Sequence, residues 1–175
     1  MSEQLVITAL GRDRPGIVDQ LSEALGSRDL NIEDSRMSVL GGEFAVMLLV
    51  SGDSSAIDDF LAEMPALEEA LDMQLLARTT TPPPARPDLV PYRIEVVSMD
   101  HPGIVHELAR FFSRRNINIV ELETESHPAA HTGTPMFAMH MVIGIPADQP
   151  IARLREEFLA TCEERNLDAS MTAMA

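Results

Sequence analysis

The sequence contains no lysine, because all 13 of its basic residues are arginine. Without lysine, the chain cannot form a Schiff base with a carbonyl substrate or supply the lysine of a P-loop. Positive charge is scarce as well, since 28 acidic residues give a formal net charge of −15. A chain this acidic repels a phosphate backbone, so we expect no direct binding to DNA or RNA. Any role in gene regulation is then expected to run through a partner protein.

Cysteine and long apolar runs are also scarce. The single cysteine, Cys162, excludes an intramolecular disulfide and a cysteine-based zinc site. The longest apolar stretch lies near residues 44–50 and is far shorter than the roughly 20 residues that a membrane-spanning helix needs. The first four residues carry no basic segment of the kind that opens a secretory signal. We therefore expect a cytoplasmic protein without membrane contact.

The sequence does contain an internal repeat. Residues 13–18, Asp-Arg-Pro-Gly-Ile-Val, recur as Asp-His-Pro-Gly-Ile-Val at residues 100–105. At the same spacing, Leu21 matches Leu108, Arg28 matches Arg115, Asn31 matches Asn118 and Ile32 matches Ile119. The next matching residues of the two copies lie further apart in the sequence than the earlier ones. The second copy therefore contains an insertion, which we place in a long loop over residues 125–134. Two copies indicate a tandem duplication of one small domain.

Each copy shows the same order of expected elements. In the first, we expect strands at 3–10, from Asn31, at 43–51 and at 73–79, with helices from Ile17 and Ser54. In the second, we expect strands at 92–97, from Asn118, at 136–145 and at 167–172, with helices from Ile104 and Pro150. Asp13 and Asp100 are natural helix caps, each followed by a proline in the first helical turn. Pro65 is expected to end or kink its helix.

The order β-α-β-β-α-β, found twice, predicts an α+β protein with two ferredoxin-like domains. Each would have a four-stranded antiparallel sheet with two helices on one face. We place the domains at residues 1–79 and 91–175, joined by an extended proline-rich linker at 80–90. Each domain leaves one sheet face bare. The other repeat is the obvious cover for that face, and a homodimer is an arrangement that the sequence leaves open.

The Asp-x-Pro-Gly turns are the strongest candidates for a binding site. A helix N-terminus presents free N–H groups and a partial positive charge, which suit a carboxylate. Gly16 and Gly103 lack a Cβ, so a ligand can approach the backbone closely. Asn31 and Asn118 lie at the far end of the helix that follows each turn, and they reach a turn only across an interface. The alternative is a purely structural role, in which the aspartate caps the helix, the glycine allows the turn and the asparagine ends the helix.

Two such units, each with Asp-x-Pro-Gly-Ile-Val before a helix and Asn-Ile after it, resemble tandem ACT domains, which are small regulatory modules that bind amino acids. Residues 8–18, Thr-Ala-Leu-Gly-Arg-Asp-Arg-Pro-Gly-Ile-Val, resemble the opening of the glycine cleavage system transcriptional repressor family. The resemblance covers essentially the whole chain. It implies a sensor of glycine or a similar small amino acid that represses transcription through a protein partner, such as a LysR-type activator.

The resemblance also implies which residues bind the ligand. Carried over position by position, the ligand-binding residues are Asp13, Arg14, Gly16, Ile17, Asn31, Asp100, His101, Gly103, Ile104 and Asn118. The copies differ where Arg14 in one corresponds to His101 in the other, so the two sites are expected to be unequal. The alternative function is an allosteric regulatory subunit of an enzyme of amino-acid metabolism.

Other residues favour neither catalysis nor a metal. His127 and His131 lie in a predicted loop, and Cys162 falls on the apolar stripe of a helix. Glu121, Glu123 and Glu125 alternate along one strand, as on a solvated sheet face. Nothing assembles a nucleophile, a base and an oxyanion site. We therefore expect no enzymatic activity, no catalytic residue, no metal site and no cofactor.

Overall fold

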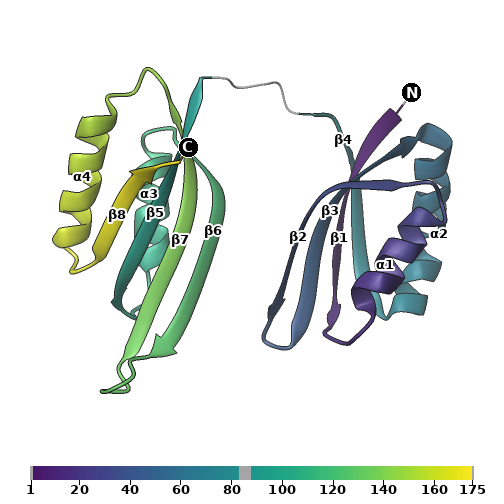
Figure 1. The fold of residues 1–175 in the computed structure, drawn as a ribbon, viewed down its shortest axis with the longest axis horizontal. Helices are drawn as coiled ribbons and strands as arrows, with labels where there is room; N and C mark the ends of the chain where they lie inside the picture. The colour runs from purple at the N-terminus through teal and green to yellow at the C-terminus, as the bar shows by residue number, and fades with distance from the viewer. Residues whose placement is uncertain (1, 83–87, 175) are drawn as a thin grey trace. The chain divides into compact units, whose positions relative to one another are not determined.

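The computed structural model describes residues 2–82 and 88–174. The chain divides into two compact units, Met1–Pro84 (unit 1) and Ala85–Ala175 (unit 2). Residues 83–87 of the predicted linker lie outside the described residues. Figure 1 labels the elements of both units, and we describe each unit by itself.

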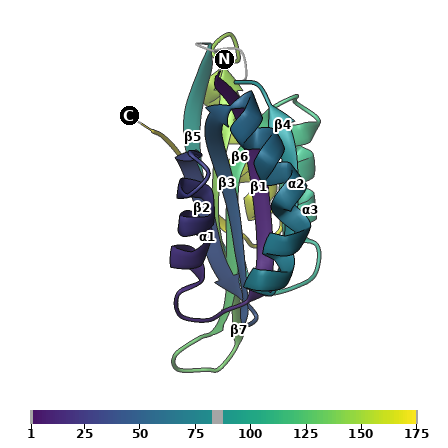
Figure 2. The same cartoon turned by 90° about the vertical axis from the view of Figure 1, so that its right-hand side faces the viewer.

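Unit 1 has the predicted βαββαβ order. Its elements are β1 (Ser2–Arg12), α1 (Ile17–Gly26), β2 (Asn31–Leu40), β3 (Glu43–Asp53), α2 (Ser54–Leu71) and β4 (Met73–Thr80). The strands form one antiparallel sheet in the order β2-β3-β1-β4. The helices α1 and α2 lie side by side on one face of this sheet (Figure 2).

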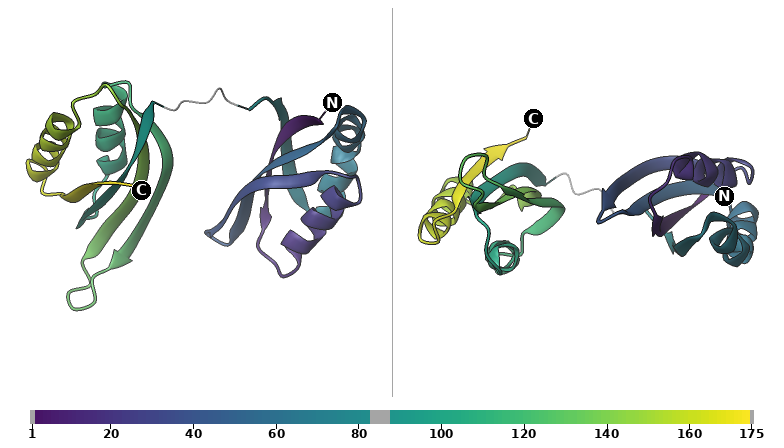
Figure 3. Two further views of the ribbon diagram at one scale, coloured as in Figure 1. Left: turned by 45° about the horizontal axis from the view of Figure 1, so that its top comes forward. Right: turned by 90° about the horizontal axis from the view of Figure 1, so that it is seen from below.

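Unit 2 repeats this arrangement. Its elements are β5 (Leu89–Met99), α3 (Ile104–Ser113), β6 (Asn118–Pro128), β7 (Pro135–Pro146), α4 (Ile151–Glu163) and β8 (Asp168–Ala173). The sheet order is β6-β7-β5-β8, again antiparallel throughout. In each unit both helices cover the same side of the sheet (Figure 3). The predicted fold class is therefore confirmed.

Each unit has its own core between sheet and helices. Along β5 the side chains of Tyr92, Ile94 and Val96 are buried, while the residues between them are exposed, which is the period of two that one covered face requires. The core of unit 1 and the core of unit 2 share no residue. Cys162 is buried in the unit 2 core, and burial raises the pKa of its thiol to about 11.

The matched arginines of the repeat tie the two helices of each unit together. Arg115 donates one hydrogen bond to the Phe111 carbonyl at 2.9 Å and another to Glu157 of α4, also at 2.9 Å. Arg28 makes the corresponding bonds to the Ala24 carbonyl and to Glu63 of α2. These bonds satisfy carbonyls at the ends of α1 and α3, which lack helical partners. The match between Arg28 and Arg115 thus reflects packing.

The expected helix caps are wrong. The residue preceding α1 is Gly16 and that preceding α3 is Gly103, and neither helix has a side-chain cap. Both glycines have positive φ, 87° and 103°, so the chain enters the helix through a left-handed turn. Asp13 and Asp100 lie before that turn, and the proline that follows in each motif also lies outside the helix. Geometry at the glycine, rather than aspartate capping, sets where these helices begin.

Three other expectations also need correction. Pro65 does not end its helix, since α2 continues to Leu71, where Leu67 and the buried Leu71 still pack on the core beyond the proline. Residues 125–128 belong to β6 and pair with β7, which leaves only 129–134 between the strands. The strand expected at 92–97 begins earlier, because the central strand β5 starts at Leu89 and includes Pro91. The Pro91 carbonyl accepts a hydrogen bond from the Met174 amide at 3.0 Å.

Candidate functional site

The first turn, Asp13 to Gly16, joins the end of β1 to the start of α1. The Asp13 amide donates a hydrogen bond to the Gly42 carbonyl at 3.1 Å, which fixes the turn to the β2–β3 hairpin. The first hydrogen bond of α1 runs from the Gln20 amide to the Gly16 carbonyl at 3.0 Å. The amides of the first helical turn, beginning at Ile17, have no helical acceptor. Together with the helix dipole they make a place for an anionic group.

The second turn, Asp100 to Gly103, has the same backbone. The Asp100 amide bonds the Pro135 carbonyl at 2.9 Å, and the Glu107 amide bonds the Gly103 carbonyl at 3.0 Å. The side chain differs in its contacts, because the Asp100 carboxylate accepts a hydrogen bond from the Ser126 hydroxyl of β6 at 2.8 Å. The second turn is therefore tied to β6 by a side chain as well as by the backbone.

Arg14 and His101 also differ in their contacts. The Arg14 guanidinium donates to Gln20 Oε1 at 2.7 Å and to the Leu71 carbonyl at 2.9 Å, which joins the first turn to the end of α2. The His101 Nδ1 atom lies 3.2 Å from the carbonyl of its neighbour Pro102, and among the described residues it makes no hydrogen bond to another element. The two turns therefore differ in their side-chain surroundings.

The space around both glycines is open. A Cβ placed on Gly16 or Gly103 would meet no atom within 4 Å. A small molecule therefore has room at the helix N-termini. The positive φ of both residues means that any side chain there also strains the backbone.

Asn31 and Asn118 lie away from the turns of their own units. Asn31 begins β2 opposite Ser51, whereas the turn follows Arg12 at the other end of the sheet, opposite Glu43. A helix of ten residues separates them, which spans about 15 Å. The expectation that asparagine and turn do not meet within one domain is confirmed. Asn31 instead donates to Glu33 at 2.9 Å, and this bond, after a stronger one from Ser51, lowers the pKa of Glu33.

The sequence reading missed an apolar groove beside the first turn. It has a volume of about 80 Å³ and lies between α1, β2 and β3, with Val18, Ser22, Ile32 and Met37 among its lining residues and none from the turn itself. Val18 and Met37 expose 48% and 62% of their surface, so the groove is open to solvent. Val18 belongs to the repeated motif at residues 13–18, and this repetition is the sequence signal that could have pointed to the groove.

Within residues 2–82 and 88–174, no three His, Cys, Asp or Glu side chains are placed to hold a metal ion. Glu121, Glu123 and Glu125 lie on the sheet face opposite the helices, paired in register with residues of β7. Among the helices of this part of the chain, none is long and apolar enough to cross a membrane.

Comparison with known proteins identifies both units. ACT-domain family models match residues 3–77 and residues 92–159. The fold and its paired turns therefore define a tandem ACT-domain protein. The chain is 32% identical over 170 residues to the glycine cleavage system transcriptional repressor of Escherichia coli, covering 97% of this chain and 90% of that protein. By that similarity, the chain belongs to the glycine cleavage system transcriptional repressor family.

Solved structures agree with this assignment. A protein of unknown function from Galdieria sulphuraria is 33% identical over the whole of both chains, with a TM-score of 0.85. A second structure, assigned as a glycine cleavage system transcriptional repressor, is 26% identical and covers 99% of this chain and 98% of its own, with a TM-score of 0.72. Both similarities extend across unit 1 and unit 2 of this chain.

Proposed function

We propose that this chain is a non-enzymatic sensor of glycine or a similar small amino acid that represses the glycine cleavage system through a protein partner. The observation that carries the proposal is the similarity to the Escherichia coli repressor over 97% of the chain, together with a turn in each unit that suits a carboxylate. The net charge of −15 supports action on a DNA-binding protein, such as a LysR-type activator, rather than on DNA.

In this proposal the ligand carboxylate binds the free amides at the start of α1 or α3. The donors are the backbone N–H groups of Gly16 and Ile17, or of Gly103 and Ile104. The ligand ammonium then faces the Asp13 or Asp100 carboxylate, the nearest acid in each motif.

Calorimetry with the twenty amino acids tests the binding. We expect heat from small amino acids only, and a loss of affinity of roughly tenfold or more in Asp13→Asn and Asp100→Asn, since a hydrogen bond to a charged group is lost. Asp29→Asn is the matched control. It removes the same charge at the far end of α1, where φ is 55° and asparagine is tolerated. Equal affinity in all three variants would place the ligand elsewhere.

Capture of partners from the native cell tests the regulatory role. We expect a DNA-binding activator to co-purify, and a shift of promoter DNA only when that activator is present. Co-purification of a metabolic enzyme would favour the alternative, a regulatory subunit. A DNA shift by the purified chain alone would contradict action through a partner.

A further inference from the structure

The edge strands β2 and β6 contain a bulge at the same position, two residues after the asparagine that begins each strand. The register of β2 against β3 skips Glu33, which is an extra residue between Ile32 and Asp34. The register of β6 against β7 skips Val120 at the matching place. A bulge takes the side chain of its extra residue out of the regular alternation of the strand. The repeat therefore places a glutamate at the bulge of unit 1 and a valine at the bulge of unit 2.

Glu33 accepts two hydrogen bonds at its bulge. The Ser51 hydroxyl of β3 donates to Glu33 Oε1 at 2.5 Å, and Asn31 Nδ2 donates to the same oxygen at 2.9 Å. Ser51 also lies directly opposite Asn31 in the register of the sheet. Both bonds lower the pKa of Glu33, the bond from Ser51 more strongly, so the carboxylate is ionised at neutral pH.

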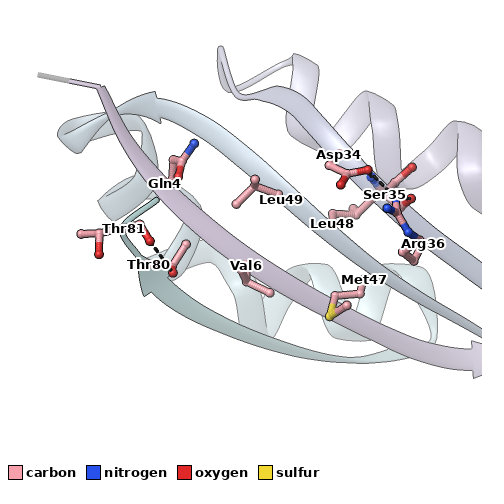
Figure 4. Close-up of a pocket in the computed structure, with 10 residues that line it drawn as sticks. All are labelled: Gln4, Val6, Asp34, Ser35, Arg36, Met47, Leu48, Leu49, Thr80 and Thr81. Carbon is pink, nitrogen blue, oxygen red and sulfur yellow. Dashed lines mark hydrogen bonds and ion pairs between the residues drawn. The ribbon is translucent and has the colours of Figure 1, made fainter. Parts of the chain in front are cut away.

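The neighbouring carboxylate, Asp34, is engaged in other contacts. It accepts a hydrogen bond from the Ser35 amide at 2.8 Å and another from the Arg36 guanidinium at 2.5 Å. These residues lie at the edge of a hollow of about 220 Å³ on unit 1 (Figure 4). Glu33 is therefore the carboxylate of this bulge that holds the Asn31 side chain.

The contact with Glu33 fixes which way the Asn31 amide is turned. An ionised carboxylate accepts hydrogen bonds and cannot donate them, so the amide must turn its N–H group towards Glu33. This leaves the carbonyl oxygen, Oδ1, to accept a bond from another molecule. Asn31 is exposed, and no residue in the described part of the chain donates to its Oδ1.

The matching asparagine of unit 2 lacks this arrangement. Asn118 lies opposite Gly144, which has no hydroxyl, whereas Asn31 lies opposite Ser51. The bulge residue next to it, Val120, exposes 60% of its surface and cannot accept a hydrogen bond through its side chain. Neither group that holds the asparagine of unit 1 has a counterpart at these positions of unit 2.

We propose that Glu33 is a positioning residue, which holds the Asn31 side chain with Oδ1 ready to accept a hydrogen bond from the ammonium group of the ligand. This inference rests on the proposed function and on the expectation that Asn31, which lies away from the turn of its own unit, meets a ligand-bound turn across an interface. An amide held in one orientation before binding loses less entropy when the ligand arrives. Asn31 is therefore a better acceptor than Asn118.

Calorimetry with glycine tests this role. Glu33→Val gives unit 1 the bulge residue of unit 2 and should weaken binding by roughly twofold to tenfold, because the Asn31 amide can then rotate. Glu33→Gln keeps an oxygen that accepts both hydrogen bonds, so it should bind nearly as tightly as the original chain. Asn31→Ala should weaken binding more than Asn118→Ala does. Glu123→Val removes an exposed glutamate from the edge strand of unit 2 and, as the control, should leave the affinity unchanged.

NMR spectroscopy of the Asn31 side-chain amide gives a second measurement, which needs no ligand. In the original chain, these resonances should shift as Glu33 takes up a proton, at a pH below the ordinary pKa of 4.5 for this group. The shift should be absent in Glu33→Gln, which has no proton to take up in this range. Circular dichroism of every variant checks that the fold is intact.

The outcomes separate this inference from the proposed function. Glycine binding that Glu33→Val leaves unchanged, or Asn31 resonances that do not respond to Glu33, would overturn the inference while the proposed function stands. Equal losses of affinity in Glu33→Val and Glu33→Gln would also overturn it, because charge rather than position would then account for the effect. If the original chain binds no amino acid, the proposed function fails and the inference fails with it.

Discussion

The Ser126 hydroxyl donates a hydrogen bond to the Asp100 carboxylate at 2.8 Å, and unit 1 has no counterpart to this contact among the described residues. Val39 takes the position of Ser126, since each lies opposite the first core phenylalanine of the next strand. Valine offers no hydroxyl to Asp13. The two turns share a backbone conformation but hold their aspartates differently.

Exchanging these two residues should change the proposed ligand affinity of each turn in opposite directions. Ser126→Ala removes the hydrogen bond that orients the Asp100 carboxylate, which is worth about 1 kcal/mol. It should therefore weaken binding at the second turn several-fold. Val39→Ser should strengthen binding at the first turn. Calorimetry in an Asp13→Asn or Asp100→Asn background isolates each turn. Identical affinities before and after both exchanges would show that neither aspartate contacts the ligand.

Glycine at the start of each helix should be required for stability. Gly16→Ala forces a side chain into φ of 87° and should lower the free energy of unfolding by about 1–2 kcal/mol. Gly26→Ala, at the other end of α1, meets nothing within 4 Å and has no positive φ, so it should be neutral or stabilising. Chemical denaturation compares the two, and equal effects would contradict the role of the left-handed turn.

The two units should unfold separately when one core is damaged. Phe158 is fully buried against Phe111 and Phe112, so Phe158→Ala should cost about 3–5 kcal/mol in unit 2 alone. Phe60→Ala is the counterpart in the unit 1 core. Calorimetry should show one transition lowered in each variant and the other unchanged. A single transition that shifts equally in both would mean that the cores are coupled.

Cys162 should be inert in the folded protein. Burial raises the pKa of its thiol to about 11, so at pH 8 the folded chain holds it protonated and out of reach. A disulfide reagent should react only after denaturant is added. Because the pKa of the Cys162 thiol in the folded chain lies above its ordinary value of 9.0, the thiol favours the folded state below pH 9, and that contribution is lost as the pH rises towards 11. Rapid labelling of the folded chain at pH 8 would contradict this.

The fold followed from the sequence because periodicity and the repeat agreed with each other. The apolar spacing of Ile104, Leu108 and Phe112 gave the helix, and the duplicated motif fixed the order of elements twice. The helix caps were mispredicted because an aspartate before a helix is a common cap, while the left-handed φ of Gly16 is not visible in a sequence. Helix α2 continues beyond Pro65 because the packing of Leu67 and Leu71 on the core outweighs the tendency of proline to end a helix.

The candidate site was only partly predictable, since its contacts join distant segments. The sequence picked out Arg14 but not its bond to Leu71, which lies at the end of another helix. Likewise, nothing local connects Ser126 with Asp100. Such contacts depend on the register of β6 against β7, and this register is shifted by an irregularity between Ile119 and Glu121 that the amino-acid pattern does not reveal.

The alternation of buried and exposed residues along each strand has an evolutionary consequence. On β5, Arg93 and Glu95 share a strand with the core residues Ile94 and Val96 yet contribute nothing to that core. After a duplication, mutations at such positions are nearly free of selection for folding. One copy of the gene segment can therefore change its surface charge while both copies keep the same architecture, as the opposite charges at Arg36 and Glu123 illustrate.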